Sequence, residues 1–529
     1  MMRRALGWLL LMLGASALRA QEPVWQWSVP FGAGRAFLWI PEDCARVRAV
    51  VLAQHNLIEQ GILEHRALRT TLAELNFAAV LIAPPFDPAF DFTRGAGERL
   101  DAVLHALAVE SGYGEIATAP IAPMGHSACA SFPWNFAAWA PERTLAALSL
   151  KGDAPQTNLT GSGAPNPVWG GARLAGIPGL MVMSEQEWWE DRLAPLERFR
   201  EAHPAAPLAV LCDTGRGHFD ATDELVEFLA LFLRKAALAR LAPAGGALRA
   251  VDPRTGVEVR SRFPEAESAP RSFWGFDAEM ARATEAIHRR DHGKRPQQVA
   301  FASRGALVPI STSHAGVELT FRPEADGLTL RLEGAFIAPL PPREPVAAKD
   351  RPRPVTTVQP RPAEPGAHAP GPVCLEWIVG PVRPAGAGEF RVAFDRLASV
   401  RDARAFDAWL LARHPGDGEF RGAVQQGRLR LPRFARGLEQ TIGFPAISDR
   451  PANAGAVPLG ARSSAGLPVG YYVREGPAVV RDGRLHFTAV PPRARWPVRV
   501  TVVAWQIGRG AEPEVRGATP VERSFLLQP

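Results

Sequence analysis

Between residues 36 and 240, short apolar runs alternate with stretches that have helical spacing. The apolar runs are 48–54, 77–83, 119–124, 145–150, 179–183 and 208–212. Helical stretches cover 63–76, 98–109 and 222–240. Strands that are buried on both faces are nearly continuous apolar runs, and the helices between them cover the two faces of a parallel sheet. The alternation therefore predicts an α/β fold with a largely parallel sheet.

The composition of the sequence changes after Pro243–Gly246, where short alternating strands replace the α/β pattern. We therefore divide the 529 residues into five parts. They are a signal peptide (1–20), the α/β domain (21–241), a linker and helical segment (242–299), a β-rich domain (300–440) and a β-sandwich (441–529). A helix is predicted over 276–288, and strands 317–321 and 328–332 flank a turn at Asp326-Gly327. Residues 339–372 are rich in proline and predict a loop. Evenly spaced strands at 469–473, 485–488 and 498–504 predict the sandwich.

The N-terminus has the pattern of an export signal. Arg3 and Arg4 precede a short apolar run over 5–13, and small residues follow up to Ala20. The run is shorter than the roughly 20 residues that a membrane-spanning helix needs, and no later stretch reaches that length. We therefore expect an exported protein, periplasmic or secreted, without a membrane span.

The charge and the cysteines exclude several classes of function. There are 60 basic and 54 acidic residues, without a basic run, so a nucleic-acid partner is not expected. The four cysteines are far apart and match neither a disulfide framework nor a zinc site. We predict buried free thiols at Cys129 and Cys212, no metal site and no cofactor.

The pattern that carries chemistry is Gly125-His126-Ser127-Ala128-Cys129, directly after the apolar run 119–124. A nucleophilic serine on a tight strand-to-helix turn needs small residues two positions before and two positions after it. Gly125 meets that need, whereas Cys129 stands where a glycine is usual. Ser127 is the predicted nucleophile.

The partners of Ser127 are predicted from the order serine, acid, histidine. His218 follows the last apolar run, and an imidazole there would accept the proton of the serine hydroxyl. The acid lies after the run 179–183, where Glu187 is our first choice and Glu185 its close rival. Asp153, after the run 145–150, is a third option.

An oxyanion hole needs two N–H donors beside the nucleophile. One is the backbone N–H of Ala128, and the second is the backbone N–H of Asn56 or Leu57, in the loop after the run 48–54. The simpler interpretation of this loop is a turn whose polar groups are satisfied internally.

Two loops beside the predicted site carry tryptophans, Trp169 and Trp188. Their rings would stack on sugar or phenolic groups of a substrate, although each ring is also able simply to pack its loop. No helical insertion lies between Gly152 and Gly179. This favours an open site for a bulky or polymeric substrate, unless the β-rich parts fold over it.

With these motifs, residues 36–240 resemble the α/β-hydrolase superfamily, in the direction of esterases and lipases. The resemblance is carried by GHSAC, by GRGHFD around His218 and by the order of the strands. It implies acyl transfer through an ester bond to the serine. Residues 463–506 resemble bacterial immunoglobulin-like repeats, which carry no catalytic residues.

The sequence thus favours an exported serine hydrolase of carboxylic esters, with acyl esters on a polysaccharide or another polymer among its substrates. A second hypothesis is a surface or binding protein whose hydrolase domain has lost activity. Cys129 in place of glycine and the two large β-rich regions favour that alternative.

Overall fold

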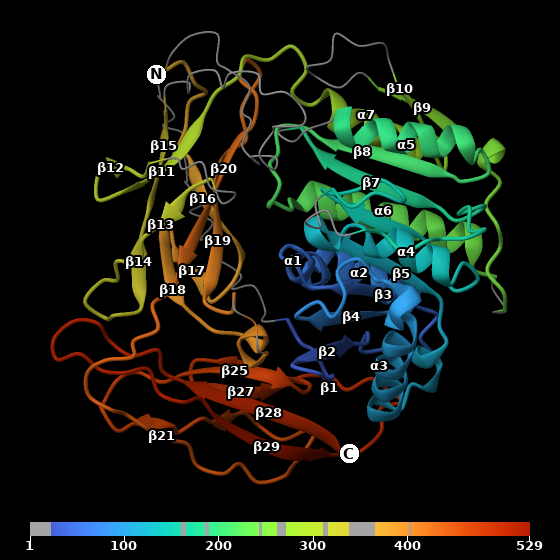
Figure 1. Cartoon of the computed structure of the whole chain (residues 1–529). Helices are drawn as coiled ribbons and strands as arrows, with labels where there is room; N and C mark the ends of the chain where they lie inside the picture. Colours follow the sequence, from blue (N-terminus) through green and yellow to red (C-terminus); the bar gives the residue numbers. More distant parts are fainter. Residues whose placement is uncertain are drawn as a thin grey trace, which may run out of the picture.

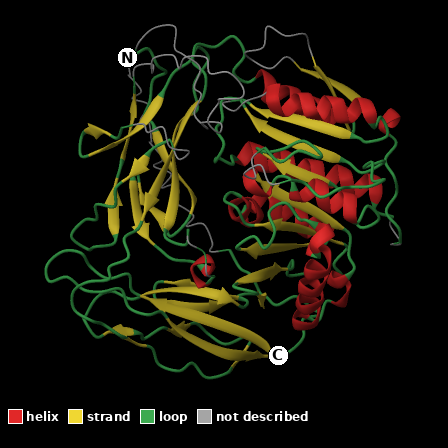
Figure 2. Ribbon diagram, viewed as in Figure 1, coloured by secondary structure: helices red, strands yellow, loops and turns green. Residues whose placement is uncertain are grey.

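The computed structural model describes residues 23–159, 165–185, 190–242, 246–261, 271–309, 316–337, 366–400, 402 and 404–529. It contains a helix-covered sheet and two regions built almost entirely of strands (Figures 1 and 2). The predicted signal peptide and residues 339–365 of the proline-rich stretch lie outside the described residues. Among the described residues, no helix is long and apolar enough to cross a membrane.

The first domain is built on an eight-stranded sheet with the strand order β1-β2-β4-β3-β5-β6-β7-β8. The strands are β1 (Trp27–Phe31), β2 (Gly34–Trp39), β3 (Ala49–Gln54), β4 (Phe77–Ala83), β5 (Ile121–His126), β6 (Ala147–Leu150), β7 (Gly179–Ser184) and β8 (Leu208–Asp213). β2 is antiparallel to β1 and β4, and β3 to β8 are parallel. This topology is that of the α/β-hydrolase fold, so the predicted fold class is confirmed.

Helices cover both faces of the sheet because successive strand residues point to opposite sides. The helices are α1 (Glu59–Glu64), α2 (Arg66–Leu75), α3 (Ala96–Ser111), α4 (Phe132–Trp139), α5 (Glu190–Ala202) and α6 (Asp223–Arg240). Val51 packs in one core with α2 and α6, whereas Val50 packs in another with α3. The helix predicted over 63–76 is interrupted at His65, whose ring accepts a hydrogen bond from the Ala67 N–H at 3.2 Å.

The chain then passes through β9 (Val257–Ser261), β10 (Arg271–Gly275) and α7 (Ala278–Arg289) into the β-rich domain. Its strands are β11 (Val299–Ser303), β12 (Ala306–Leu307), β13 (Glu318–Leu319), β14 (Thr329–Arg331), β15 (Glu333–Phe336), β16 (Cys374–Val379), β17 (Val382–Gly386), β18 (Glu389–Val392), β19 (Asp407–His414) and β20 (Ala423–Arg430). The strands on either side of Asp326-Gly327 are not hairpin partners: β13 pairs with β20, and β14 with β18.

The C-terminal domain has a four-stranded sheet, β22-β29-β28-β25, and a three-stranded sheet, β23-β27-β26. Its strands are β21 (Ile442–Gly443), β22 (Arg450–Pro451), β23 (Val457–Pro458), β24 (Arg462–Ser463), β25 (Gly470–Glu475), β26 (Ala478–Arg481), β27 (Arg484–Phe487), β28 (Val498–Trp505) and β29 (Val521–Gln528). Side chains of both sheets share one apolar core with α3 and β2 of the first domain. The two domains are therefore packed together as one body.

The β-rich domain is joined to α1 by partly buried polar contacts. Gln60 Nε2 donates to Asp395 Oδ2 at 3.0 Å, and Glu64 forms an ion pair with Arg396 at 2.6 Å. Arg396 begins a short 3-10 turn, Arg396–Ser399. Paired and hydrogen-bonded charges of this kind fix the orientation of two packed parts. The β-rich domain is thus held beside the end of the sheet from which α1 starts (Figure 1).

Candidate active site

Ser127 lies on a sharp turn directly after β5. Its φ angle is +52°, in the left-handed region that non-glycine residues rarely adopt. The short 3-10 turn Ser127–Cys129 follows at once, and α4 begins at Phe132. A serine held in this strained conformation between a strand and a helix is what a nucleophile elbow requires.

Gly125 shows why the elbow needs a small residue. A Cβ atom at this position would lie 1.9 Å from the carbonyl oxygen of Cys129, which is far inside van der Waals contact. The Cys129 side chain is itself fully buried, and burial raises the pKa of its thiol well above the ordinary value. A cysteine is thus accommodated where glycine is usual, as an unreactive neutral thiol.

The structure brings Ser127 and His218 together. His218 Nε2 lies 2.7 Å from Ser127 Oγ, which is hydrogen-bond distance. His218 is 1% exposed and its ring packs edge-on against Phe219, with ring centroids 4.6 Å apart. The geometry allows the imidazole to take the hydroxyl proton as the oxygen attacks an electrophile.

Lys151 holds the loop that carries His218. Its buried ammonium group donates to the Gly217 carbonyl at 2.8 Å and forms ion pairs with Asp220 at 2.9 Å and Asp213 at 3.3 Å. Burial raises the pKa of Asp213, and the neighbouring Lys151 opposes that rise. No motif marks Lys151 in the sequence, although it directly follows the predicted strand 145–150.

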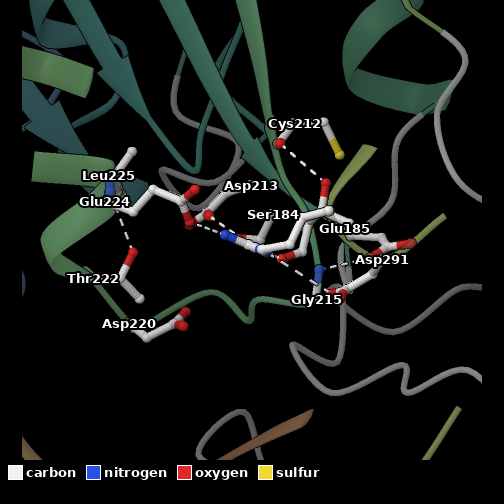
Figure 3. A network of polar contacts seen from close by, with 12 residues as sticks. Ser184, Glu185, Cys212, Asp213, Gly215, Asp220, Thr222, Glu224, Leu225 and Asp291 are labelled. Atoms are coloured by element: carbon white, nitrogen blue, oxygen red, sulfur yellow. Dashed lines mark hydrogen bonds and ion pairs between the residues drawn. The ribbon is translucent and has the colours of Figure 1, made fainter. Parts of the chain in front are cut away.

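The candidate acids have different surroundings. Glu185 is buried, and its Oε2 accepts from the Gly215 N–H at 2.6 Å (Figure 3). Its Oε1 accepts from Arg421 of the β-rich domain. Asp153 is fully buried, and its carbonyl oxygen accepts from Trp134 Nε1 at 2.7 Å. Glu187, the first choice from the sequence, lies outside the described residues.

The predicted second oxyanion donors have another partner. The N–H groups of Asn56 and Leu57 both donate to Glu59 Oε2, at 3.0 and 2.7 Å. Glu59 Oε1 accepts from the N–H of His126 at 2.8 Å. In this structure the carboxylate therefore occupies the N–H groups that the sequence predicts for the oxyanion hole.

Glu59 is fully buried, and burial raises its pKa from 4.5 to about 7 against the opposing effect of these N–H groups. Sequence reasoning missed it because a glutamate at the start of a short helix has no motif.

Of the two predicted substrate-binding tryptophans, the structure describes Trp169, and its ring is buried. Trp169 is 7% exposed, donates from Nε1 to Asn135 Oδ1 at 2.7 Å and packs edge-on against Phe199. It belongs to an apolar core, which agrees with the second interpretation given above, that the ring packs its own loop. Trp188 lies outside the described residues.

The β-rich domain covers the site. Trp409 of β19 packs on Phe219, with ring centroids 4.4 Å apart, and Arg404 donates to Asn56 Oδ1 at 3.2 Å. Ser127 is only 7% exposed. A small cavity of about 50 Å³ lies between the 55–57 loop and residues of the 379–409 segment. The β-rich domain therefore packs beside Ser127, where the sequence predicts an open site unless the β-rich parts fold over it.

Among the described residues, no group of three or more His, Cys, Asp and Glu side chains is arranged to hold a metal ion. The cysteines form no disulfide; Cys44, Cys129 and Cys212 are buried, and Cys374 is exposed. The buried free thiols predicted at Cys129 and Cys212 are confirmed.

No family model matches the sequence, and no curated protein is similar to it. Solved structures resemble about two fifths of the chain. An esterase from Pyrobaculum calidifontis is 17% identical, over 40% of this chain and 86% of its own, with a TM-score of 0.29.

An alpha-beta serine hydrolase homologue from Coxiella burnetii is 15% identical, over 39% of this chain and 94% of its own (TM-score 0.27). A monoglyceride lipase from Saccharomyces cerevisiae is 13% identical, over 42% and 98% (TM-score 0.28). At these identities the functional assignment rests on the geometry of this chain's own residues.

Proposed function

We propose that this protein is an exported serine hydrolase that cleaves carboxylic esters through an acyl-enzyme. The observation that carries the proposal is the 2.7 Å separation of Ser127 Oγ and His218 Nε2 at an elbow after β5. The hydroxyl proton passes to His218 as Oγ attacks the ester carbonyl carbon. The alcohol leaves with that proton, and water, deprotonated by the same imidazole, releases the carboxylic acid.

The acid of the triad is Glu187 in this proposal. This choice is supported by the bonds of its rival, Glu185. Both carboxylate oxygens of Glu185 accept hydrogen bonds from other groups, Gly215 and Arg421. A carboxylate that orients the histidine is worth about 10⁴-fold in kcat in a serine protease. Glu187→Gln is expected to lower kcat by about 10³-fold, and Glu185→Gln far less. The opposite order of the two effects would assign the role to Glu185.

The backbone N–H of Ala128, which follows the nucleophile, supplies one oxyanion donor. A second donor from Asn56 or Leu57 requires the Glu59 carboxylate to release one of its N–H partners. This step belongs to substrate binding, when the ester oxygen competes for the same N–H group. Tight binding of a boronic acid or phosphonate to the wild type, lost in Ser127→Ala, would support it.

The substrate is a carboxylic ester whose acyl part is small, because Ser127 is 7% exposed beneath the β-rich domain. The proposal of an acyl ester on a polysaccharide is retained for groups that project from the polymer, such as acetyl. p-Nitrophenyl esters from acetate to octanoate, with Ser127→Ala as control, test this. We expect the rate to fall with chain length, and comparison with an acetylated polysaccharide then tests the polymer.

A second candidate function is a binding or surface protein with an inactive hydrolase site. The specific observation in its favour is the occupation of the Asn56 and Leu57 N–H groups by Glu59. If wild type and Ser127→Ala both hydrolyse every ester at the background rate, this function replaces the first. Export is tested separately, by the N-terminal sequence of the mature protein, which we expect to begin near residue 21.

A further inference from the structure

His126, the residue before the nucleophile, is held at each of its polar atoms. Its backbone N–H donates to Glu59 at 2.8 Å, and its carbonyl oxygen accepts from Asn56 Nδ2 at 3.2 Å. In its ring, Nε2 lies 2.8 Å from the carbonyl oxygen of His218, and Nδ1 lies 3.4 Å from Asn56 Nδ2. The side chain is fully buried and touches the loop of the catalytic base, so it does more than fill space.

The direction of each hydrogen bond follows from the partners. A carbonyl oxygen only accepts, so the proton of this bond lies on His126 Nε2. A guanidinium only donates, so Arg404, 3.2 Å away, fixes the Asn56 Oδ1 as the acceptor and turns Nδ2 toward the His126 ring. The chain of bonds therefore runs from Arg404 through Asn56 and His126 to the backbone of His218.

We propose that His126 is a positioning residue for His218. We also propose that Arg404 of the β-rich domain contributes to this positioning through Asn56. The inference rests on the proposed function, because it concerns the base of the same reaction. The bond to the His218 carbonyl sets the height of the imidazole above Ser127. Trp409 of the β-rich domain also packs on Phe219, the residue after His218, with the two ring planes tilted by 39°.

Small displacements of the His218 imidazole lower the rate of the reaction strongly. A displacement of about 1 Å between reacting groups costs up to about 10²-fold in rate, without the same effect on binding. Loss of the bond from His126 should therefore lower kcat and leave KM nearly unchanged. Arg404 is 42% exposed in its side chain, so its removal should have a smaller effect in the same direction.

Substitutions at position 126 separate positioning from packing. Gln places an amide nitrogen near the position of Nε2 and keeps the bond to His218, whereas Asn is too short to reach it. Leu keeps the volume and loses both ring bonds. We expect kcat to fall about 30- to 100-fold in His126→Leu and His126→Asn, and within about 5-fold in His126→Gln. Equal losses in Gln and Leu would overturn the positioning role.

At the β-rich domain, Arg404→Ala should lower kcat about 3- to 10-fold, and Arg404→Lys, which still donates, should restore most of it. Arg391→Ala is the matched control. Its side chain is 46% exposed and pairs with Asp326 inside the β-rich domain. The double variant Arg404→Ala, His126→Leu should be no slower than His126→Leu alone, because one chain of bonds is cut twice. Additive losses in kcat would contradict a continuous series of hydrogen bonds from Arg404 to His218.

Hydrogen exchange of the 215–221 segment provides a readout that does not depend on turnover. His126→Leu and Arg404→Ala should speed this exchange, and Arg391→Ala should leave it unchanged. If the wild type hydrolyses no ester but the segment responds in this way, the proposed function falls and the positioning inference stands. If the wild type is active and neither kcat nor exchange responds, the inference falls alone.

Discussion

At the scale of single residues, Glu59 is the least expected feature of the site. A fully buried carboxylate accepts hydrogen bonds from N–H groups of the loop after β3 and from the N–H of His126, the residue before Ser127. No motif marks it, because its role arises only when β3 and β5 lie side by side. Ser127 and His218 were accessible to prediction, since each follows an apolar strand in the order that the chemistry requires.

The raised pKa of Glu59 predicts a pH-dependent stability. Its pKa rises from 4.5 to about 7 in the folded state, so the folded protein binds this proton more tightly than the unfolded chain. The contribution is fully present below about pH 4.5 and is lost as the pH rises through 7. It amounts to about 3 kcal/mol in the free energy of unfolding.

Urea unfolding of wild type and Glu59→Gln between pH 4 and pH 8 measures this effect. The difference in free energy of unfolding between the two proteins should change by about 3 kcal/mol over this range, to the disadvantage of the wild type at high pH. A difference that is independent of pH would contradict the pKa shift.

The cysteines give a second prediction for single residues. Burial raises the pKa of Cys129 and Cys212 well above the ordinary value, and that of Cys44 to about 11. Iodoacetamide reacts with thiolates, so the native protein at pH 8 should be modified at the exposed Cys374 alone. Mass spectrometry of the digest reads this out, and rapid labelling of Cys129 in the native protein would contradict it.

At the scale of elements, the inner strands agree closely with their predicted bounds. β4 (Phe77–Ala83) has the bounds of the predicted run 77–83. β7 and β8 are each one residue longer at the C-terminal end than their predicted runs, 179–183 and 208–212. Strands buried on both faces leave a continuous apolar signal. The hairpin of β1 and β2 escaped prediction because glycines and polar residues interrupt its pattern. The partner of β13 is β20, 110 residues away, and no local pattern encodes such a pairing.

Substitution of Lys151 tests how strongly its ion pairs stabilise the loop after β8. Lys151→Met removes the cation between Asp213 and Asp220 and leaves their carboxylates buried without it. Breaking a buried pair costs about 3–5 kcal/mol, so we expect a loss of this size and a lower kcat. Lys235→Met, at the more exposed pairs with Asp277 and Glu279, should cost at most about 1 kcal/mol. Thermal and urea unfolding compare the two, and equal losses would argue against the clamp.

At the scale of the whole molecule, the domains share their cores. Trp409, Val379 and Val400 of the β-rich domain belong to the same apolar cluster as α2 and α6, and the C-terminal domain shares a cluster with α3. The sequence placed the domains in order but held no signal for their contacts. The β-rich domain packs on the loops beside Ser127, which the sequence analysis foresaw only as an exception to an open site.

Shared cores predict cooperative unfolding. Scanning calorimetry of the mature protein should show a single main transition, and a chain that ends at residue 241 should be insoluble or lack a cooperative transition. The truncation exposes the apolar surfaces that the two β-rich parts now cover. Three separate transitions, or a stable and active fragment 21–241, would contradict this.

The central claim is that Ser127 and His218 form a working nucleophile and base, and a fluorophosphonate probe tests it most directly. The probe reacts only with a serine whose proton is taken up as it attacks. We predict stoichiometric labelling of the peptide that contains Ser127, none in Ser127→Ala and at least about 10²-fold slower labelling in His218→Ala. An unlabelled wild type, or a label on another residue, would contradict the claim.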